Sequence, residues 1–459
     1  MGRLVVPRRS VLKGIGAAGL AACGPGADVG RKPVSPDVVP GSIDTIVICM
    51  MENRSFDHVF GSLSLLEGRT EVDGLRAGMS NPDLDGNDVP VGPLLEPCTD
   101  PDPPHGWDSS RVQFDEGTNQ GFVRAYQIED GGPPANVMAY QTREQQPVSY
   151  ALADAYTLCQ RWFSSVLTST WPNRLYFHAA SSQGVPSNDL PPGGYTLRTI
   201  WDQLTDAGID WAYYFTDLPT LALFANEDFA GHLRFIDQFY ADAAAGTLPP
   251  VVCVDAGAGF NDDHPPHHPM LGQLFLGSIY AALAASPQWS RSLFLTTYDE
   301  AGGFFDHVPP GTMPDDYADQ GFDQLGFRVP AILAGPYVRP GPSDLPCDHT
   351  AAMSLIQRLF GIDEPLTSRN AASADLTGAI DWGAVAQGRA ADPIPLPVIE
   401  RSAEEVEAEC RTAGRRVGQP ELQAFVRERY PRLDRTRDLP RTAWRMWQRA
   451  AELGLWVPR

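Results

Sequence analysis

Two pairs of polar residues each follow an apolar stretch that is typical of a buried β-strand. The first pair follows residues 45–50 and the second follows residues 293–297. The four residues are Glu52, Asn53, Asp299 and Glu300. Like charges held close together resist joint ionisation unless a cation lies between them. Carboxylate and amide oxygens favour Mg²⁺, Mn²⁺ or Ca²⁺ over zinc, so the pairs predict one divalent metal site.

Two further observations bear on this predicted metal site. Gly302 and Gly303 follow the second pair and would let the backbone turn sharply away from the ion. The residues alone leave an alternative open, in which Glu52 and Glu300 pair with arginines such as Arg54 or Arg328 and no metal is involved.

The stretch from Leu167 to Arg174 offers a nucleophile. Coordination to a metal lowers the pKa of a hydroxyl and activates it, which makes Thr170 the candidate. Asn173 and Arg174 are suited to binding an oxyanion. The alternative is that the hydroxyl residues before Pro172 only cap a helix or form a turn.

Four histidines stand in polar loop segments and could act on a phosphate. A histidine can donate a hydrogen bond to a phosphate or protonate a leaving oxygen. They are His105, His264, His307 and His349. Each of them alone is also compatible with a purely structural role.

The elements that must position these residues alternate along the chain. Strands are expected at 45–50, 211–215, 251–254, 293–297 and 329–333, and helices at 149–166, 271–285 and 349–360, the last capped by Asp348. Nearly continuous apolar strands separated by helices predict an α/β fold with a mostly parallel sheet covered on both faces. Ligands of such sheets lie beyond the carboxyl ends of the strands, where both polar pairs stand.

The chain ends differ from this main part. Residues 1–23 resemble a twin-arginine export signal that ends in a lipoprotein box at Cys23, and residues 24–41 have the composition of a linker. The main domain is expected over residues 42–400, with a helical extension over 401–459 packed on it. We therefore expect an exported envelope lipoprotein, periplasmic or extracellular. A plain cleaved signal is the alternative.

The composition of the chain limits the kinds of partner that it can bind. The chain has 459 residues, 43% of them hydrophobic, so it can bury a large core. Its formal charge of −22 argues against a nucleic-acid partner and against simple electrostatic docking on anionic membranes. Six cysteines follow Cys23 without a CxxC pair, and their pairing cannot be deduced.

Taken together, several blocks resemble the bacterial phosphoesterase family, which contains phosphatidylcholine-preferring phospholipases C and a branch of acid phosphatases. The blocks are ENRSFDH from Glu52, TWPNR from Thr170, DHPP from Asp263, YDE with GGFFDH from Tyr298, and DHT from Asp348. The resemblance implies an alkaline-phosphatase-like three-layer α/β/α sandwich over residues 42–400.

The resemblance also implies site roles. Glu52, Asn53, Asp299 and Glu300 would hold the metal with Thr170, which would attack phosphorus and form a phospho-enzyme intermediate. His105, His264 and His349 would contact the phosphoryl group or the leaving oxygen, and we assign Asn173, Arg174 and His307 to substrate binding. The match around His105 is loose, and the chain lacks the long β-rich C-terminal modules of the larger haemolytic members.

The leading hypothesis is therefore an exported, metal-dependent phosphoesterase that acts as a phospholipase C on phospholipid headgroups. The alternatives are an acid phosphatase acting on monoesters or another small phosphate ester, and a non-catalytic surface lipoprotein on the same fold. A sulfatase ranks below these, because threonine cannot be converted to the aldehyde that sulfatases need.

Overall fold

A computed structural model describes residues 42–129, 131–410 and 419–457. Its centre is an eight-stranded sheet in the order β12-β6-β11-β10-β1-β9-β7-β8. The strands are β1 (Thr45–Met51), β6 (Thr157–Cys159), β7 (Trp211–Phe215), β8 (Leu233–Phe235), β9 (Val251–Asp255), β10 (Ser292–Tyr298), β11 (Ala331–Ala334) and β12 (Gly341–Ser343). Of these eight strands, only β11 runs antiparallel to its neighbours, which are β10 and β6. The predicted mostly parallel sheet is confirmed.

The middle of the sheet consists of β1 between β9 and β10, both parallel to it. Every residue of these three strands is buried, which explains their nearly unbroken apolar sequences. All three strands end at the same edge of the sheet. The residues that come after them are therefore placed side by side.

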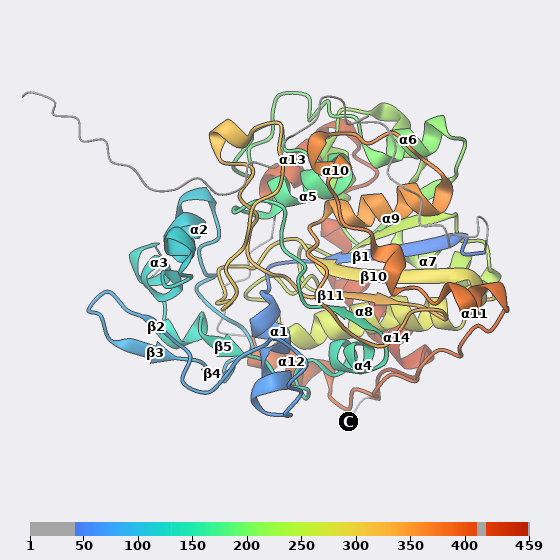
Figure 1. Cartoon of the computed structure of the whole chain (residues 1–459). Helices are drawn as coiled ribbons and strands as arrows, with labels where there is room; N and C mark the ends of the chain where they lie inside the picture. The colour runs from blue at the N-terminus through green and yellow to red at the C-terminus, as the bar shows by residue number, and fades with distance from the viewer. Residues whose placement is uncertain (1–41, 130, 411–418, 458–459) are drawn as a thin grey trace, which may run out of the picture.

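Helices cover both faces of the sheet (Figure 1), which confirms the predicted α/β/α layering. One layer contains α5 (Thr170–Ala179), α6 (Ile200–Asp206), α9 (Thr350–Phe360), α10 (Ser368–Ala371) and α13 (Pro420–Arg429). The opposite layer centres on α8 (Pro269–Ala284), against which α4 (Pro147–Ala155), α7 (Ile236–Ala245) and α14 (Leu439–Glu452) pack. Three further helices are α1 (Phe56–Leu65), α11 (Trp382–Ala386) and α12 (Ala403–Glu409).

A smaller lobe projects from one side of the sandwich (Figure 1). It contains α2 (Trp107–Phe114), α3 (Phe122–Glu129), and the short strands β2 (Ser80–Pro82), β3 (Asp88–Pro90), β4 (Gly92–Pro93) and β5 (Ala139–Tyr140). A second hydrophobic cluster that includes Phe122, Tyr126 and Phe305 holds this lobe together. His105 lies in the loop between β4 and α2.

The five predicted strands are present, but the predicted helix at 149–166 is wrong in its second half. Helix α4 ends at Ala155 because Tyr156 adopts an extended backbone, and residues 157–159 then enter the sheet as β6. The predicted cap of α9 is also shifted by one residue. His349 occupies the cap position, while a carboxylate oxygen of Asp348 accepts a hydrogen bond from the backbone N–H of Thr350.

The C-terminal segment shares the core of the sandwich. Val406, Leu422, Val426 and Trp447 belong to the same cluster of buried residues as the sheet. A disulfide joins Cys98 to Cys410, 312 residues apart, and thereby links the end of α12 to the loop that leads to His105.

The predicted export signal, Cys23 anchor and linker lie outside the described residues. Within the described ranges, no helix combines the length and the apolar character that a membrane span needs.

Candidate active site

The two polar pairs lie together at the carboxyl ends of β1 and β10. The backbone N–H of Asn53 donates to a carboxylate oxygen of Asp299 at 3.1 Å, and the N–H of Arg54 donates to the carbonyl of Glu300 at 3.1 Å. Adjacent parallel strands thus bring together residues that are far apart in sequence. All four predicted oxygen ligands are buried.

Gly302 makes this close approach possible. Its φ is +61°, and an added Cβ would lie 2.2 Å from the carbonyl oxygen of Asn53. Its N–H donates to Glu300 Oε2 at 2.6 Å and fixes that carboxylate. Asn53 also has a positive φ of 61°, a conformation that costs energy outside glycine and that functional sites often retain. The predicted turn at the glycine pair is therefore present.

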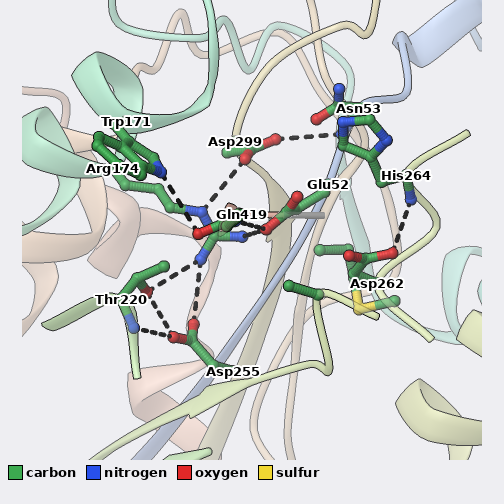
Figure 2. A network of polar contacts seen from close by, with 12 residues as sticks. Glu52, Asn53, Trp171, Arg174, Thr220, Asp255, Asp262, His264, Asp299 and Gln419 are labelled. Atoms are coloured by element: carbon green, nitrogen blue, oxygen red, sulfur yellow. Dashed lines mark hydrogen bonds and ion pairs between the residues drawn. The ribbon is translucent and has the colours of Figure 1, made fainter. Parts of the chain in front are cut away.

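A buried arginine occupies the space beside the two pairs (Figure 2). The guanidinium of Arg174 forms ion pairs with Glu52 at 2.9 Å, Asp255 at 3.1 Å and Asp299 at 3.2 Å. Gln419, from the C-terminal segment, donates to the same oxygen of Glu52 at 3.1 Å. The arginine pairing considered for Glu52 is thus present, but its partner is Arg174.

The two arginines named in that alternative are engaged elsewhere. Arg328 forms ion pairs with Asp57 and Asp306, and the guanidinium of Arg54 lies over the ring of Phe304. The predicted substrate contact of Arg174 also changes, because its guanidinium is held by three carboxylates. We assign Arg174 the role of positioning Glu52 and Asp299.

The single charge of Arg174 does not balance the four nearby carboxyl groups of Glu52, Asp255, Asp299 and Glu300. Burial raises the pKa of Glu52 well above its usual range, although Arg174 opposes the shift. Burial also raises the pKa of Glu300 to about 8, against the effect of His105 and with a further contribution from Asp299. Burial therefore disfavours the charged form of both carboxyls as long as no further cation is bound beside them.

Two oxygen atoms on the side of Glu300 fit a cation. Asn53 Oδ1 and Glu300 Oε1 are buried and have no hydrogen-bond partner among the described residues. Buried polar atoms without partners are rare and call for an unseen ion or water. Oxygen donors of this kind suit Mg²⁺, Mn²⁺ or Ca²⁺, and which of these metals binds stays a prediction.

Thr170 is the first residue of α5, one turn before Arg174. Residues i and i+4 share a face of a helix, so Thr170 lies on the face that Arg174 turns toward Glu52 and Asp299. The Thr170 side chain is buried, and no described residue hydrogen-bonds to its hydroxyl. The amino end of a helix also favours a bound anion.

Asn173 has a different role from the predicted one. Its amide accepts from the backbone N–H of Val166 and donates to the carbonyls of Val166, Thr168 and Ser169. These contacts use both ends of the amide and fix the loop before Thr170. Asn173 therefore positions the candidate nucleophile, and its amide is not available to bind substrate.

His105 and His264 lie on the open side of Glu300. Their rings stand edge to face with centroids 5.7 Å apart. His105 Nε2 is 3.2 Å from Asn53 Nδ2 and 3.9 Å from Glu300 Oε1, and His105 lines a small cavity with Thr168 and Glu300. Burial lowers the pKa of His105, but Glu300 and Asp102 outweigh it and raise the pKa to about 9.

The other two predicted histidines make structural contacts. His349 Nε2 donates to the carbonyl of Asp299 at 2.6 Å, while its Nδ1 accepts from Trp162. Burial lowers the pKa of His349 to about 4, so the ring stays neutral. It holds Asp299 in place, and neither ring nitrogen is free to protonate a leaving oxygen.

His307 lies in a second charged cluster. Its ring bonds to Asp57 at 2.6 Å and to Asp73 at 3.2 Å. The guanidinium of Arg328 donates to Asp57 and Asp306 in the same cluster. Both ring nitrogens are thus engaged away from the two polar pairs, which leaves no free group for the predicted substrate contact.

Three residues of this site were not predicted from the sequence. They are Asp102, Asp255 and Gln419. Asp255 ends β9 and could have been found by the same strand-end rule that found Glu52 and Asp299. Asp102 lies in a loop, and Gln419 lies far beyond the last motif, so no local pattern marked them.

Comparison with known proteins identifies the family to which the chain belongs. The model of the Phosphoesterase family matches residues 43–363. Non-specific phospholipase C1 of Arabidopsis thaliana is 34% identical over 385 residues, covering 74% of this chain and 71% of that protein. Phospholipase C A of Mycobacterium tuberculosis is 31% identical over 449 residues, covering 83% of this chain and 86% of that protein.

Among solved structures, an alkaline phosphatase superfamily protein from Vibrio parahaemolyticus aligns with a TM-score of 0.38 at 13% identity, covering 73% of this chain and 71% of that chain. That likeness is too weak to bear on function. The family match and the two relatives together show that this chain belongs to the Phosphoesterase family and is a phosphoric ester hydrolase.

Proposed function

We propose that this protein is a metal-dependent phospholipase C that cleaves phospholipid headgroups through Thr170. The observation that carries the proposal is the convergence of both polar pairs with the amino end of α5, beside two buried oxygens that have no partner among the described residues. The relatives named phospholipase C support the substrate class, since this chain covers most of their length.

The chain's own residues suit a two-step displacement. In the first step the Thr170 hydroxyl loses its proton as its oxygen attacks phosphorus and the bond from phosphorus to the glycerol oxygen breaks. The glycerol oxygen takes up one proton, which balances the one lost by Thr170, and leaves in diacylglycerol. In the second step a water oxygen attacks the same phosphorus and the bond to Thr170 breaks. The phosphorylated headgroup is released, and the threonine recovers its proton.

The surrounding residues position the nucleophile and favour the negative phosphate. Asn173 fixes the loop before Thr170, and Arg174 and His349 hold Glu52 and Asp299. At the start of α5 the N–H of Trp171 donates to Asn188 Oδ1 and Pro172 has no N–H, so the contribution of this helix end to a phosphate near Thr170 is its dipole. A divalent cation held by Glu52, Asn53, Asp299 and Glu300 would lower the pKa of the threonine hydroxyl and offset the phosphate charge.

A substitution series at Thr170 tests the nucleophile. Thr170→Ala should lower hydrolysis of phosphatidylcholine by at least ~10³-fold, while Thr170→Ser should keep part of the activity because it keeps a hydroxyl. Both variants should melt near the wild-type temperature, since the hydroxyl has no hydrogen bond to a described residue that could be lost. Full activity in Thr170→Ala would eliminate the mechanism.

A substrate panel tests the class of ester. Phosphatidylcholine, sphingomyelin, a simple monoester and a sulfate ester should be compared, each with and without chelator. We expect release of phosphorylated headgroup from the phospholipids and its loss with chelator. Turnover of the monoester alone would identify an acid phosphatase, and turnover of none would favour a non-catalytic binding protein.

We further propose that the protein is exported by the twin-arginine route and anchored by lipid at Cys23. The support is the sequence of residues 1–23 alone. Cys23→Ala should move the protein from the membrane fraction to the soluble fraction of cells. Retention of the variant in the membrane fraction would remove the anchor.

A further inference from the structure

We propose that a pocket between α7 and α14 binds a phosphate group, at a site separate from the candidate active site. The pocket is a cavity of about 130 Å³. Its lining includes Thr216, which follows β7, and Phe235, which ends β8, so the pocket lies at the same edge of the parallel strands as the active site. Ligands of open parallel sheets bind at this edge. Among the described residues, none that belongs to the candidate active site lines the pocket.

Four arginine side chains line this pocket. They are Arg435, Arg441, Arg445 and Arg449. The last three are spaced four residues apart along α14 and therefore share one face of that helix. Like charges at this spacing repel one another and destabilise a helix, and a bound anion would remove that repulsion.

The neighbouring carboxylates do not balance these four charges. The ion pairs of the pocket are Arg435–Asp438 at 3.4 Å, Arg445–Asp237 at 2.8 Å and Arg449–Glu452 at 2.7 Å. Arg441 forms no ion pair with any residue that the structure describes. Exposed ion pairs are weak, so the paired guanidinium groups can exchange a carboxylate for a phosphate. The pocket thus keeps an unbalanced positive charge in a chain whose formal charge is −22.

Aromatic rings hold two of the guanidinium groups in place. The guanidinium of Arg435 lies over the ring of Phe235, 3.8 Å from its centroid, and that of Arg449 lies over the ring of Tyr240 at 5.0 Å. Such a contact restrains the side chain and leaves the N–H groups at the guanidinium edge able to donate. A phosphate would therefore meet donors that are already positioned, which lowers the entropy cost of binding it.

The donors identify the chemical class of the ligand. Each guanidinium presents a fork of N–H groups that matches two oxygens of a phosphate. A phosphate monoester carries about two negative charges and offers three acceptor oxygens, which suits several arginines better than the single charge of a carboxylate. The side chains of Arg435 and Arg445 are 42% and 55% exposed, so the pocket is open to solvent. The phosphate can therefore belong to a free ion or to the headgroup of an anionic lipid.

Titration calorimetry with inorganic phosphate tests the pocket. The full chain is used in chelator, so that no metal at the active site contributes to phosphate binding. Arg441→Gln and Arg445→Gln should each weaken phosphate binding by ~10-fold or more, because each loses hydrogen bonds to a charged group.

Arg198→Gln is the matched control. The side chain of Arg198 is 56% exposed and pairs with Asp206, much as Arg445 is 55% exposed and pairs with Asp237, but Arg198 lies outside the pocket. This variant should bind phosphate as wild type does. Thermal melting should show that every variant is folded.

Vesicle flotation in chelator separates the two sources of phosphate. Vesicles of phosphatidylcholine alone are compared with vesicles of equal parts phosphatidylcholine and phosphatidic acid, and every protein carries Cys23→Ala so that no lipid on Cys23 contributes. A preference for the mixed vesicles that Arg441→Gln loses would assign a lipid headgroup. Phosphate binding that Arg441→Gln weakens, without a vesicle preference, would assign a free phosphate.

Two results would overturn the inference. One is wild-type binding of phosphate and of vesicles by folded Arg441→Gln and Arg445→Gln. The other is a wild-type arginine pocket that binds neither phosphate nor the mixed vesicles. Neither measurement records hydrolysis, so the outcome is independent of the proposed catalytic function.

Discussion

Replacing Arg174 tests whether the buried charge network beside the site is held together by this one side chain. We choose Arg174→Met, because methionine keeps much of the length and apolar stem but removes the charge and the donors. The change leaves Glu52, Asp255 and Asp299 without the cation that each of them contacts at 3.2 Å or less.

The expected magnitude depends on burial. Removing one partner of a buried ion pair costs ~3–5 kcal/mol, because the remaining charge stays desolvated. That is a large part of the ~5–15 kcal/mol by which a folded domain is usually stable. The network here holds three carboxylates, so we expect a loss at the upper end of the range.

A surface arginine provides a matched control. Arg143 also contacts two carboxylates, those of Glu67 and Asp154, but its side chain is 42% exposed. Exposed pairs are worth ~0–1 kcal/mol, so Arg143→Met should cost little. The two variants thus compare the same substitution in two dielectric environments.

The assay is urea unfolding monitored by circular dichroism, in chelator so that no cation replaces the arginine. The loss in Arg174→Met should be largest near pH 8. It should shrink as the pH falls, because Arg174 lowers the pKa of Glu52 and its removal makes protonation of that carboxylate easier in the folded state. Equal destabilisation by Arg174→Met and Arg143→Met would refute the reasoning.

Three further changes probe other parts of the molecule. Gly302→Ala should lose most of the hydrolytic activity and about 2–4 kcal/mol of unfolding free energy, because its Cβ would clash with the Asn53 carbonyl and its φ is positive. The control is Gly311→Ala, whose Cβ would meet nothing within 4 Å. It should match wild type in hydrolysis and in urea unfolding. Burial lowers the pKa of His178 to about 3, below its unfolded value. The neutral His178 ring therefore supports the folded state fully above pH ~6.5. As the pH falls toward 3, the free energy of unfolding should drop by up to ~1.4 kcal/mol per pH unit. Denaturation of His178→Gln at several pH values should lack this drop. Gln419→Ala, which removes the hydrogen bond from the C-terminal segment to the site, should reduce kcat with little change in melting temperature, and unaltered kinetics would exclude that segment from the site.

The positions of the strand-end residues could be predicted from the sequence because they obey a local rule. A nearly unbroken apolar run must be buried on both faces, and adjacent parallel strands place the residues beyond their carboxyl ends at one edge of the sheet. Glu52 and Asp299 could be placed together on that ground alone. The turn at Gly302 could be predicted as well, because only glycine tolerates both the positive φ and the contact with the Asn53 carbonyl.

The same local rules failed where two structures compete for one pattern. Residues 149–166 show apolar spacing that fits a helix, yet only the part up to Ala155 is helical. Residues 157–159 instead fill a place in the sheet between β11 and β12, and the gain from that pairing outweighs the helical tendency. Propensity cannot reveal this, because the partner strands lie far along the chain.

The sequence by itself determined which residues are candidates for the site, namely the four oxygen-bearing side chains and Thr170, and the sheet edge that carries the strand-end pairs. Only the tertiary structure decided which groups those residues face. It placed Arg174 among three carboxylates, turned Asn173 and His349 into supports, and brought Asp102 and Gln419 to the site. The reason is physical, since side-chain partners across long loops depend on the packing of the whole core, whereas strand and turn patterns depend on neighbours in the chain.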